Sequence, residues 1–82
     1  MPKFTYVYTL QSLPHPDRRY TGLTTDLHTR LAKHNEGGNP HTVPYRPWLI
    51  QTTIAFRDPI RAAAFERYLK SHSGRAFAQK HF

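Results

Sequence analysis

The chain has 82 residues, with 12 lysines and arginines against 5 aspartates and glutamates, and a formal net charge of +7. One compact domain over residues 1–82 is expected, because two shorter domains would each be too small to sustain a core. The absence of cysteine excludes disulfides, thiolate metal sites and a cysteine nucleophile, and it fits a cytoplasmic location. No apolar run reaches the about 18 residues of a membrane span, so no membrane partner is expected, whereas the basic excess favours a polyanion such as nucleic acid.

The first predicted element is a strand over residues 3–11, KFTYVYTLQ. Its alternation places Tyr6, Tyr8 and Leu10 on one face, and this period of two with aromatic and β-branched residues is typical of a strand. The turn sequence LPHPDR follows, and a second strand is predicted at about 18–23, RRYTGL. The short spacing between the two strands predicts a hairpin.

A helix is predicted over residues 26–35, with an N-cap supplied by the Thr24–Thr25–Asp26 cluster. The next segment, EGGNPHTVPYRP, is rich in Gly and Pro and predicts a loop, after which residues 48–56, WLIQTTIAF, have the composition of a largely buried strand. Asp58–Pro59 opens a second helix that extends to about Ser71.

Ser73–Gly74 is expected to break the second helix, and a short helix closes the chain. The resulting order is β-β-α-β-α-α, with the helices packed on a small sheet, which predicts an α/β fold.

Two strand tyrosines, Tyr8 and Tyr20, are the first candidate reactive residues. The ordinary alternative is that they pack a half-buried sheet face with their hydroxyls reaching water. A chemical role requires a positive charge or a metal nearby, because a phenol with a pKa near about 10 is a poor base at neutral pH.

Arg30 and His34 lie four residues apart on the first helix, so both side chains project from one face. The ordinary alternative is a solvated basic edge, which the neighbouring Lys33 favours. Because His34 shares the apolar stripe of this helix, it should face the sheet and the tyrosines. A guanidinium directed to the same place could hold a phosphate.

Carboxylates are scarce, and this scarcity limits the metal sites that the chain can build. The five acids are Asp17, Asp26, Glu36, Asp58 and Glu66. So few acids argue against a two-metal nuclease site built from several carboxylates. Glu66 alone lies in the middle of a predicted helix, where it can either pair with Lys70 at i, i+4 or serve as the single protein ligand of a divalent ion.

Six segments in this order resemble the signature of the GIY-YIG nuclease superfamily, and they cover nearly the whole chain. They are the triplets YVY at 6–8 and YTG at 20–22, the run TTDL, the helix with R and H-N four residues later, the HT…RPW of 41–48, and FERYLKS at 65–71. The chain is similar to small stand-alone bacterial members related to the nuclease domain of the UvrC excision-repair subunit. The resemblance also implies a three-stranded antiparallel sheet flanked by helices.

The resemblance implies hydrolysis of a DNA phosphodiester with one divalent ion, Mg²⁺ or Mn²⁺, in DNA repair or processing. Carried over by position, Glu66 would bind the metal, and Tyr8 and Tyr20 would be the motif tyrosines, one of which accepts a proton from the attacking water. His34 would relay that proton and Arg30 would hold the scissile phosphate.

Two departures from the family pattern stand out. Tyr6 occupies the place of the glycine that usually begins the first triplet, and residues 76–82 lack the asparagine that some family nucleases carry beyond the metal-binding glutamate. Gln79 is the only amide in that segment.

A rival interpretation is a non-catalytic nucleic-acid-binding module with the same fold, for which the basic surface would be sufficient. A binding module has no need to keep the full motif set, so the presence of all five motif side chains favours the nuclease. The residues predicted to contact nucleic acid are Lys33, His41, Thr42, Arg46, Lys70, Arg75 and Lys80. The expected partner is DNA, branched or single-stranded. The expected location is the cytoplasm, or the nucleoid if the protein is bacterial. The sequence leaves open whether the chain forms a homodimer or acts with a partner protein that confers specificity.

Overall fold

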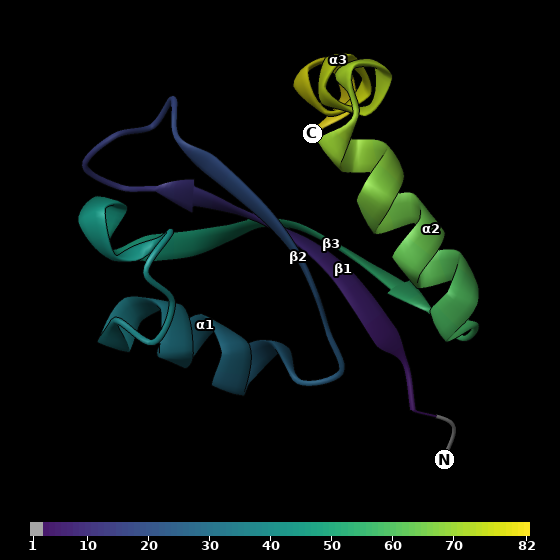
Figure 1. The fold of residues 1–82 in the computed structure, drawn as a ribbon, viewed down its shortest axis with the longest axis horizontal. Helices are drawn as coiled ribbons and strands as arrows, with labels where there is room; N and C mark the ends of the chain where they lie inside the picture. Colours follow the sequence, from purple (N-terminus) through teal and green to yellow (C-terminus); the bar gives the residue numbers. More distant parts are fainter. Residues whose placement is uncertain (1–2) are drawn as a thin grey trace.

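The computed structural model describes residues 3–82. The elements follow one another as β1 (Thr5–Ser12), β2 (Arg19–Thr24), α1 (Leu27–Glu36), the 3-10 turn η1 (Val43–Tyr45), β3 (Trp48–Phe56), α2 (Pro59–Lys70) and α3 (His72–His81) (Figure 1). This order confirms the predicted β-β-α-β-α-α arrangement and the α/β fold class. No helix within residues 3–82 is long and apolar enough to cross a membrane.

The three strands form one antiparallel sheet in the order β2-β1-β3. β1 is therefore the central strand, and β2 is an edge. In the β1–β2 pair, Tyr8 lies opposite Gly22 and Leu10 lies opposite Tyr20. The register of β1 with β3 shifts between Thr9 and Leu10, which bends the sheet at this point.

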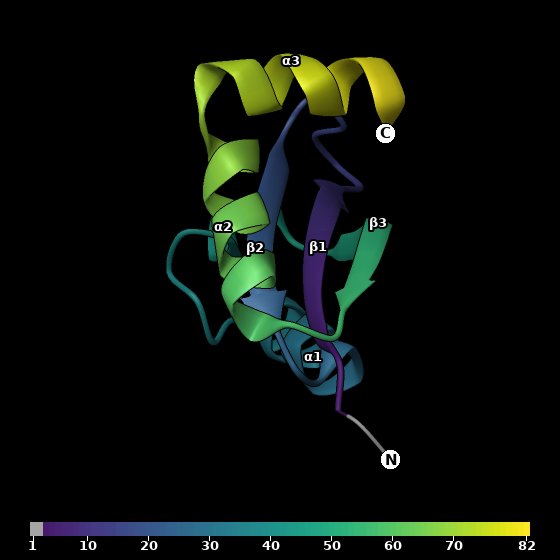
Figure 2. The same cartoon turned by 90° about the vertical axis from the view of Figure 1, so that its right-hand side faces the viewer.

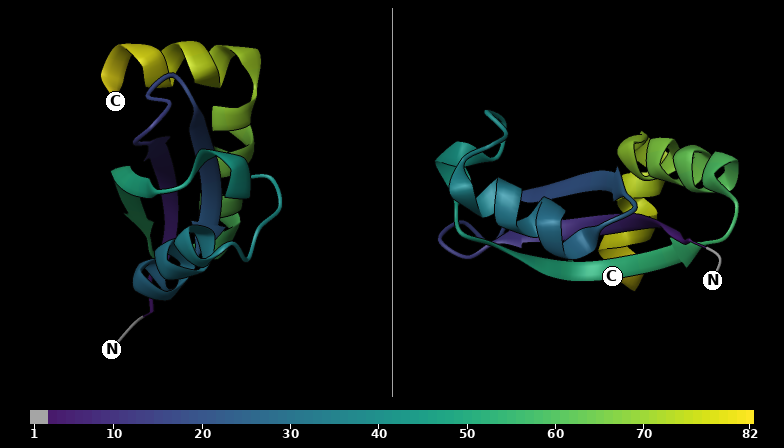
Figure 3. Two further views of the ribbon diagram at one scale, coloured as in Figure 1. Left: turned by 90° about the vertical axis from the view of Figure 1, so that its left-hand side faces the viewer. Right: turned by 90° about the horizontal axis from the view of Figure 1, so that it is seen from below.

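Each face of the sheet has its own hydrophobic core, so alternate residues of β1 are buried on opposite sides. On one face Tyr8 and Leu10 pack with Trp48 beneath α1. On the other face Val7 packs with Ala62 and Leu69 of α2. Figure 2 shows α2 in front of the sheet, with α3 crossing its end, and the left view of Figure 3 shows α1 on the opposite side. The predicted alternation along β1 is thus confirmed, with both faces covered.

Both predicted helix N-caps are confirmed. Asp26 caps α1 by accepting from the Thr29 N–H, and Asp58 caps α2 by accepting from the Ile60 N–H. The predicted end of the second helix at about Ser71 is confirmed, because α2 ends at Lys70 with Ser71 as its C-cap. The Ser73–Gly74 pair lies inside the first turn of α3, which begins when the Ser71 side chain accepts from the Gly74 N–H.

Gly74 lies inside the first turn of α3 and has a packing role there. A Cβ at this position would overlap the backbone carbonyl of Tyr68 in α2. The glycine therefore allows the two helices to approach closely at their corner.

Candidate active site

The geometry of the site begins with the pairing of Tyr8 in β1 and Gly22 in β2. The Tyr8 side chain lies across β2, where a Cβ on Gly22 would overlap its hydroxyl group. A side chain at position 22 would displace the tyrosine. The glycine of the YTG triplet is thus required to make room for the tyrosine of the YVY triplet.

Two tyrosines and a histidine pack together between the sheet and α1. The ring centroids of Tyr8 and Tyr20 are 6.4 Å apart, and those of Tyr20 and His34 are 4.8 Å apart. Tyr8 is 2% exposed and His34 is 1% exposed, whereas Tyr20 is half-buried. His34 therefore faces the tyrosines, as its place on the apolar stripe predicts.

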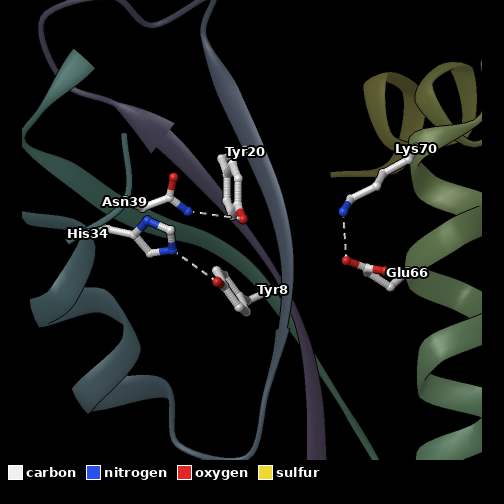
Figure 4. Close-up of polar contacts among 6 residues, drawn as sticks. All are labelled: Tyr8, Tyr20, His34, Asn39, Glu66 and Lys70. Carbon is white, nitrogen blue, oxygen red and sulfur yellow. Dashed lines mark hydrogen bonds and ion pairs between the residues drawn. The ribbon is translucent and has the colours of Figure 1, made fainter. Parts of the chain in front are cut away.

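A chain of hydrogen bonds runs from Tyr8 through His34 into the loop that follows α1. The Tyr8 hydroxyl is 3.0 Å from His34 Nε2, and His34 Nδ1 is 2.9 Å from Thr42 Oγ1 (Figure 4). The Thr42 hydroxyl donates its hydrogen to the Asn39 carbonyl at 3.2 Å.

From the Thr42 contact we infer one direction for the protons in this chain. Because the Thr42 hydroxyl already donates to Asn39, its oxygen accepts from the Nδ1–H of His34. A neutral imidazole with its hydrogen on Nδ1 has an acceptor at Nε2. With this tautomer the Tyr8 O–H donates to His34 Nε2.

The pKa values of the two groups move in the directions that keep both neutral. Burial, reinforced by Tyr20, raises the pKa of Tyr8 to about 12, although the charge of Arg30 opposes the shift. Burial lowers the pKa of His34, and the Arg30 charge adds to the effect. At neutral pH the phenol is protonated and the imidazole is uncharged, as the hydrogen-bond chain requires.

Arg30 projects from α1 close enough to the Tyr8 hydroxyl to act on its pKa. Its side chain is exposed, and in the part of the chain that the structure describes it forms no ion pair. An unpaired guanidinium beside the Tyr8 hydroxyl is suited to hold an anionic ligand such as a phosphate.

Glu66 reaches the same edge of the sheet from the opposite face. In Figure 4 its carboxylate points from α2 toward β2, beyond which the tyrosines lie. The negative charge of Glu66 helps to raise the pKa of Tyr8, so the two groups interact electrostatically across β2. Glu66 Oε2 lies 2.8 Å from Lys70 Nζ, and the Glu66 side chain is 17% exposed. The i, i+4 ion pair considered from the sequence is therefore present.

The donor set around Glu66 limits the kind of metal site that the chain can build. Within residues 3–82, no three His, Cys, Asp or Glu side chains cluster to enclose a metal ion. A single half-buried carboxylate fits Mg²⁺ or Mn²⁺, because such an ion binds one or two carboxylates and completes its coordination with water and substrate phosphate.

Most of the residues predicted to contact nucleic acid lie on the surface. The exposed ones are Lys33, His41, Arg46, Lys70, Arg75 and Lys80. Thr42 is different, because it is 0% exposed and its hydroxyl is engaged with His34 and Asn39. Its burial contradicts the predicted contact with nucleic acid and gives it a positioning role instead.

Two residues that the sequence analysis did not assign hold Thr42 in place. The Asn35 side chain accepts from the Trp48 N–H at 2.6 Å and donates to the Trp48 carbonyl at 3.1 Å. The Trp48 indole N–H donates to the Thr42 carbonyl at 2.8 Å. The sequence contained a signal for these contacts. Asn35 belongs to the H-N pair and both Thr42 and Trp48 belong to the HT…RPW segment, so all three residues lie in motifs that the sequence analysis had recognised.

Comparison with known proteins identifies the family of this chain. The GIY-YIG catalytic domain matches residues 4–80. The chain is also 38% identical over 77 residues to the structure-specific endonuclease subunit SLX1 of Candida dubliniensis, a match that covers 85% of this chain and 27% of the yeast protein. The chain thus spans about a quarter of the length of this relative. The match over almost all of its residues shows that the chain belongs to the GIY-YIG nuclease superfamily.

Proposed function

We propose that this chain is a metal-dependent DNA endonuclease that hydrolyses phosphodiester bonds with one Mg²⁺ or Mn²⁺ ion. The observation that carries the proposal is the 3.0 Å hydrogen bond between the Tyr8 hydroxyl and Nε2 of the buried His34, whose pKa is lowered by burial. Arg30 and Glu66 lie close enough to this hydroxyl to act on its pKa. The same edge of the sheet thus holds a proton path, a phosphate-binding cation and a carboxylate for the metal.

Tyr8 is proposed as the general base, because its proton has a prepared acceptor. As the water oxygen bonds to phosphorus, the water gives a proton to the Tyr8 oxygen and Tyr8 gives its own proton to His34 Nε2. The bond from phosphorus to the leaving ester oxygen breaks in the same displacement, and this oxygen takes a proton from water to leave as an alcohol. His34 then returns its extra proton to solvent, which restores the site. This concerted transfer avoids a free phenolate, which a pKa of about 12 makes rare at neutral pH.

Arg30 and Glu66 have complementary roles in this scheme. The planar guanidinium of Arg30 binds two non-bridging oxygens of the scissile phosphate and stabilises the charge that develops on them. Glu66 holds the divalent ion, which when bound acts as a Lewis acid on the phosphoryl group. Because a lysine offers a point charge in place of the two-pronged guanidinium, Arg30→Lys should lose most of the cleavage activity while DNA binding changes little.

The proposed substrate is branched or single-stranded DNA, processed in a repair reaction in the cytoplasm. The yeast relative is named as a subunit of a structure-specific endonuclease. Because that relative is named as a subunit, we infer that a partner protein or a second copy of the chain contributes to target selection.

The test is incubation of the purified chain with supercoiled plasmid and with branched DNA in Mn²⁺ or Mg²⁺, with EDTA as the control. We expect nicked products that require the metal and that nearly disappear with Arg30→Lys. Salt-sensitive binding without cleavage of any substrate would overturn the nuclease and favour the non-catalytic binding module. Cleavage that persists in EDTA would overturn the metal requirement.

A further inference from the structure

A second concave site lies on the face of the sheet away from the Tyr8–His34 pair. It is a cleft of about 760 Å³ between the beginning of β2 and helix α3. Thr9 and Thr21 pair across β1 and β2, and they project to the same side as Val7, the side covered by α2. Together with Gln51 of β3, which lies within hydrogen-bond range of Thr9, they line the cleft with polar groups.

The rest of the lining is strongly basic. Arg19 contributes from β2, Arg75 from α3 and Lys70 from the end of α2, together with Arg18, whereas Asp17 is the one acid among the lining residues. Arg19 and Arg75 are exposed, and within residues 3–82 neither forms an ion pair. Two unpaired guanidinium groups that enter one cleft from different elements create a positive potential that attracts an anion.

The cleft is continuous with the candidate active site. Lys70 lines the cleft, and its ammonium group lies 2.8 Å from the Glu66 carboxylate that we assign to the metal. Tyr20 also lines the cleft, while its ring packs on His34. A polymer with one phosphate at Arg30 and Glu66 can therefore extend past Lys70 between Arg19 and Arg75.

We propose that this cleft binds the sugar–phosphate backbone of a single nucleic-acid strand that leads away from the scissile phosphate. This proposal deepens the proposed nuclease function and rests on it only for the direction of the strand. The volume lies in the range of about 300–1,000 Å³ that holds a small ligand, so a short stretch of one strand fits and a duplex does not. Backbone contacts by arginine carry little sequence information, so the binding is expected to be independent of sequence.

The test compares two double variants that lose the same charge. Arg19→Gln with Arg75→Gln removes two cations of the cleft, and Arg57→Gln with Arg61→Gln removes two exposed cations that do not line it. Binding of labelled oligo(dT) and of a blunt duplex is measured by fluorescence anisotropy in EDTA over a range of salt concentrations. No metal is present, so no strand is cut.

We expect the cleft variant to lower the salt slope for oligo(dT) by about 1.4, since each lost phosphate contact contributes about 0.7 for a single strand. The control variant should change this slope much less, and duplex binding should fall less than oligo(dT) binding. Equal losses in the two double variants, or equal losses for the two nucleic acids, would overturn the proposal.

The two proposals fail separately. If the cleft variant behaves as expected but no substrate is cut in Mn²⁺, the strand-binding cleft holds and the nuclease assignment fails. If the parent chain nicks DNA but the cleft variant binds oligo(dT) like the parent, the cleft assignment fails and the nuclease assignment holds.

Discussion

Replacing Thr42 by valine tests the proton path without changing the shape of the site. The side chain is 0% exposed, and its hydroxyl connects His34 Nδ1 to the Asn39 carbonyl. The Asn39 carbonyl also accepts from the backbone N–H groups of Thr42 and Val43, both at 3.1 Å, so it stays satisfied in the variant. The Nδ1–H of His34 is then the one group that loses its partner.

The cost of this change can be estimated from the burial of the pair. A buried N–H without a partner costs about 1–3 kcal/mol, and this is the expected loss in the free energy of unfolding. His34 can avoid the cost by moving its hydrogen to Nε2, but it then no longer accepts from Tyr8. Without Thr42 the His34 tautomer that accepts from Tyr8 is no longer favoured by this preference of about 1–3 kcal/mol. The transition state that needs this tautomer is destabilised by the same amount, which corresponds to a decrease of roughly 5- to 150-fold in kcat.

Single-turnover nicking gives the rate, urea denaturation gives the free energy of unfolding, and ¹⁵N NMR of the imidazole identifies the tautomer. We expect the parent to carry the hydrogen on Nδ1, Thr42→Val to lose that signature and most of kcat with little change in KM, and Thr42→Ser to recover both. A Thr42→Val protein that is destabilised but nicks DNA at the parent rate would refute the claim that Thr42 orients His34 for catalysis.

Two further substitutions test the packing and the titration of Tyr8. Gly22→Ala places a Cβ on the Tyr8 hydroxyl and should lower the free energy of unfolding by about 1–3 kcal/mol; a urea midpoint equal to that of the parent would contradict the close approach. Burial raises the pKa of Tyr8 to about 12 in the folded protein, whereas the pKa of a free tyrosine is about 10. The contribution of Tyr8 to stability is therefore complete below pH about 10 and is lost as the pH rises toward 12. The parent should therefore lose stability more steeply than Tyr8→Phe over this range in urea titrations, and parallel curves would show that the hydroxyl is not shielded.

The regular elements could be predicted because their signals are local. The strand predicted over 48–56 is β3, Trp48–Phe56, and the helix predicted over 26–35 is α1, Leu27–Glu36. Alternation, capping residues and apolar stripes act within a few positions of the chain, so they can be read from sequence. The end of α2 at about Ser71 was predicted, whereas the immediate start of α3 was not, because Ser71 caps both helices and the Ser73–Gly74 pair does not reveal this.

The candidate site was predicted only as far as its motif residues extend. Thr42 lies in a loop without periodicity, and its part in orienting His34 depends on Trp48 and Asn35, which the fold brings to it. The basic cleft depends on the approach of Arg19 to Arg75, which are far apart in the sequence and meet only when α3 crosses the end of the sheet (Figure 2). Neither arrangement has a local signature.

The central claim is that Glu66 supplies the one protein ligand of a catalytic metal ion, and Glu66→Gln tests it most directly. The matched control is Glu36→Gln, which removes an equal charge at the exposed end of α1. In Mn²⁺-dependent nicking of supercoiled plasmid, combined with direct measurement of Mn²⁺ binding, Glu66→Gln should lose both cleavage and metal binding while Glu36→Gln keeps both. Cleavage by Glu66→Gln at the rate of the control would contradict the account.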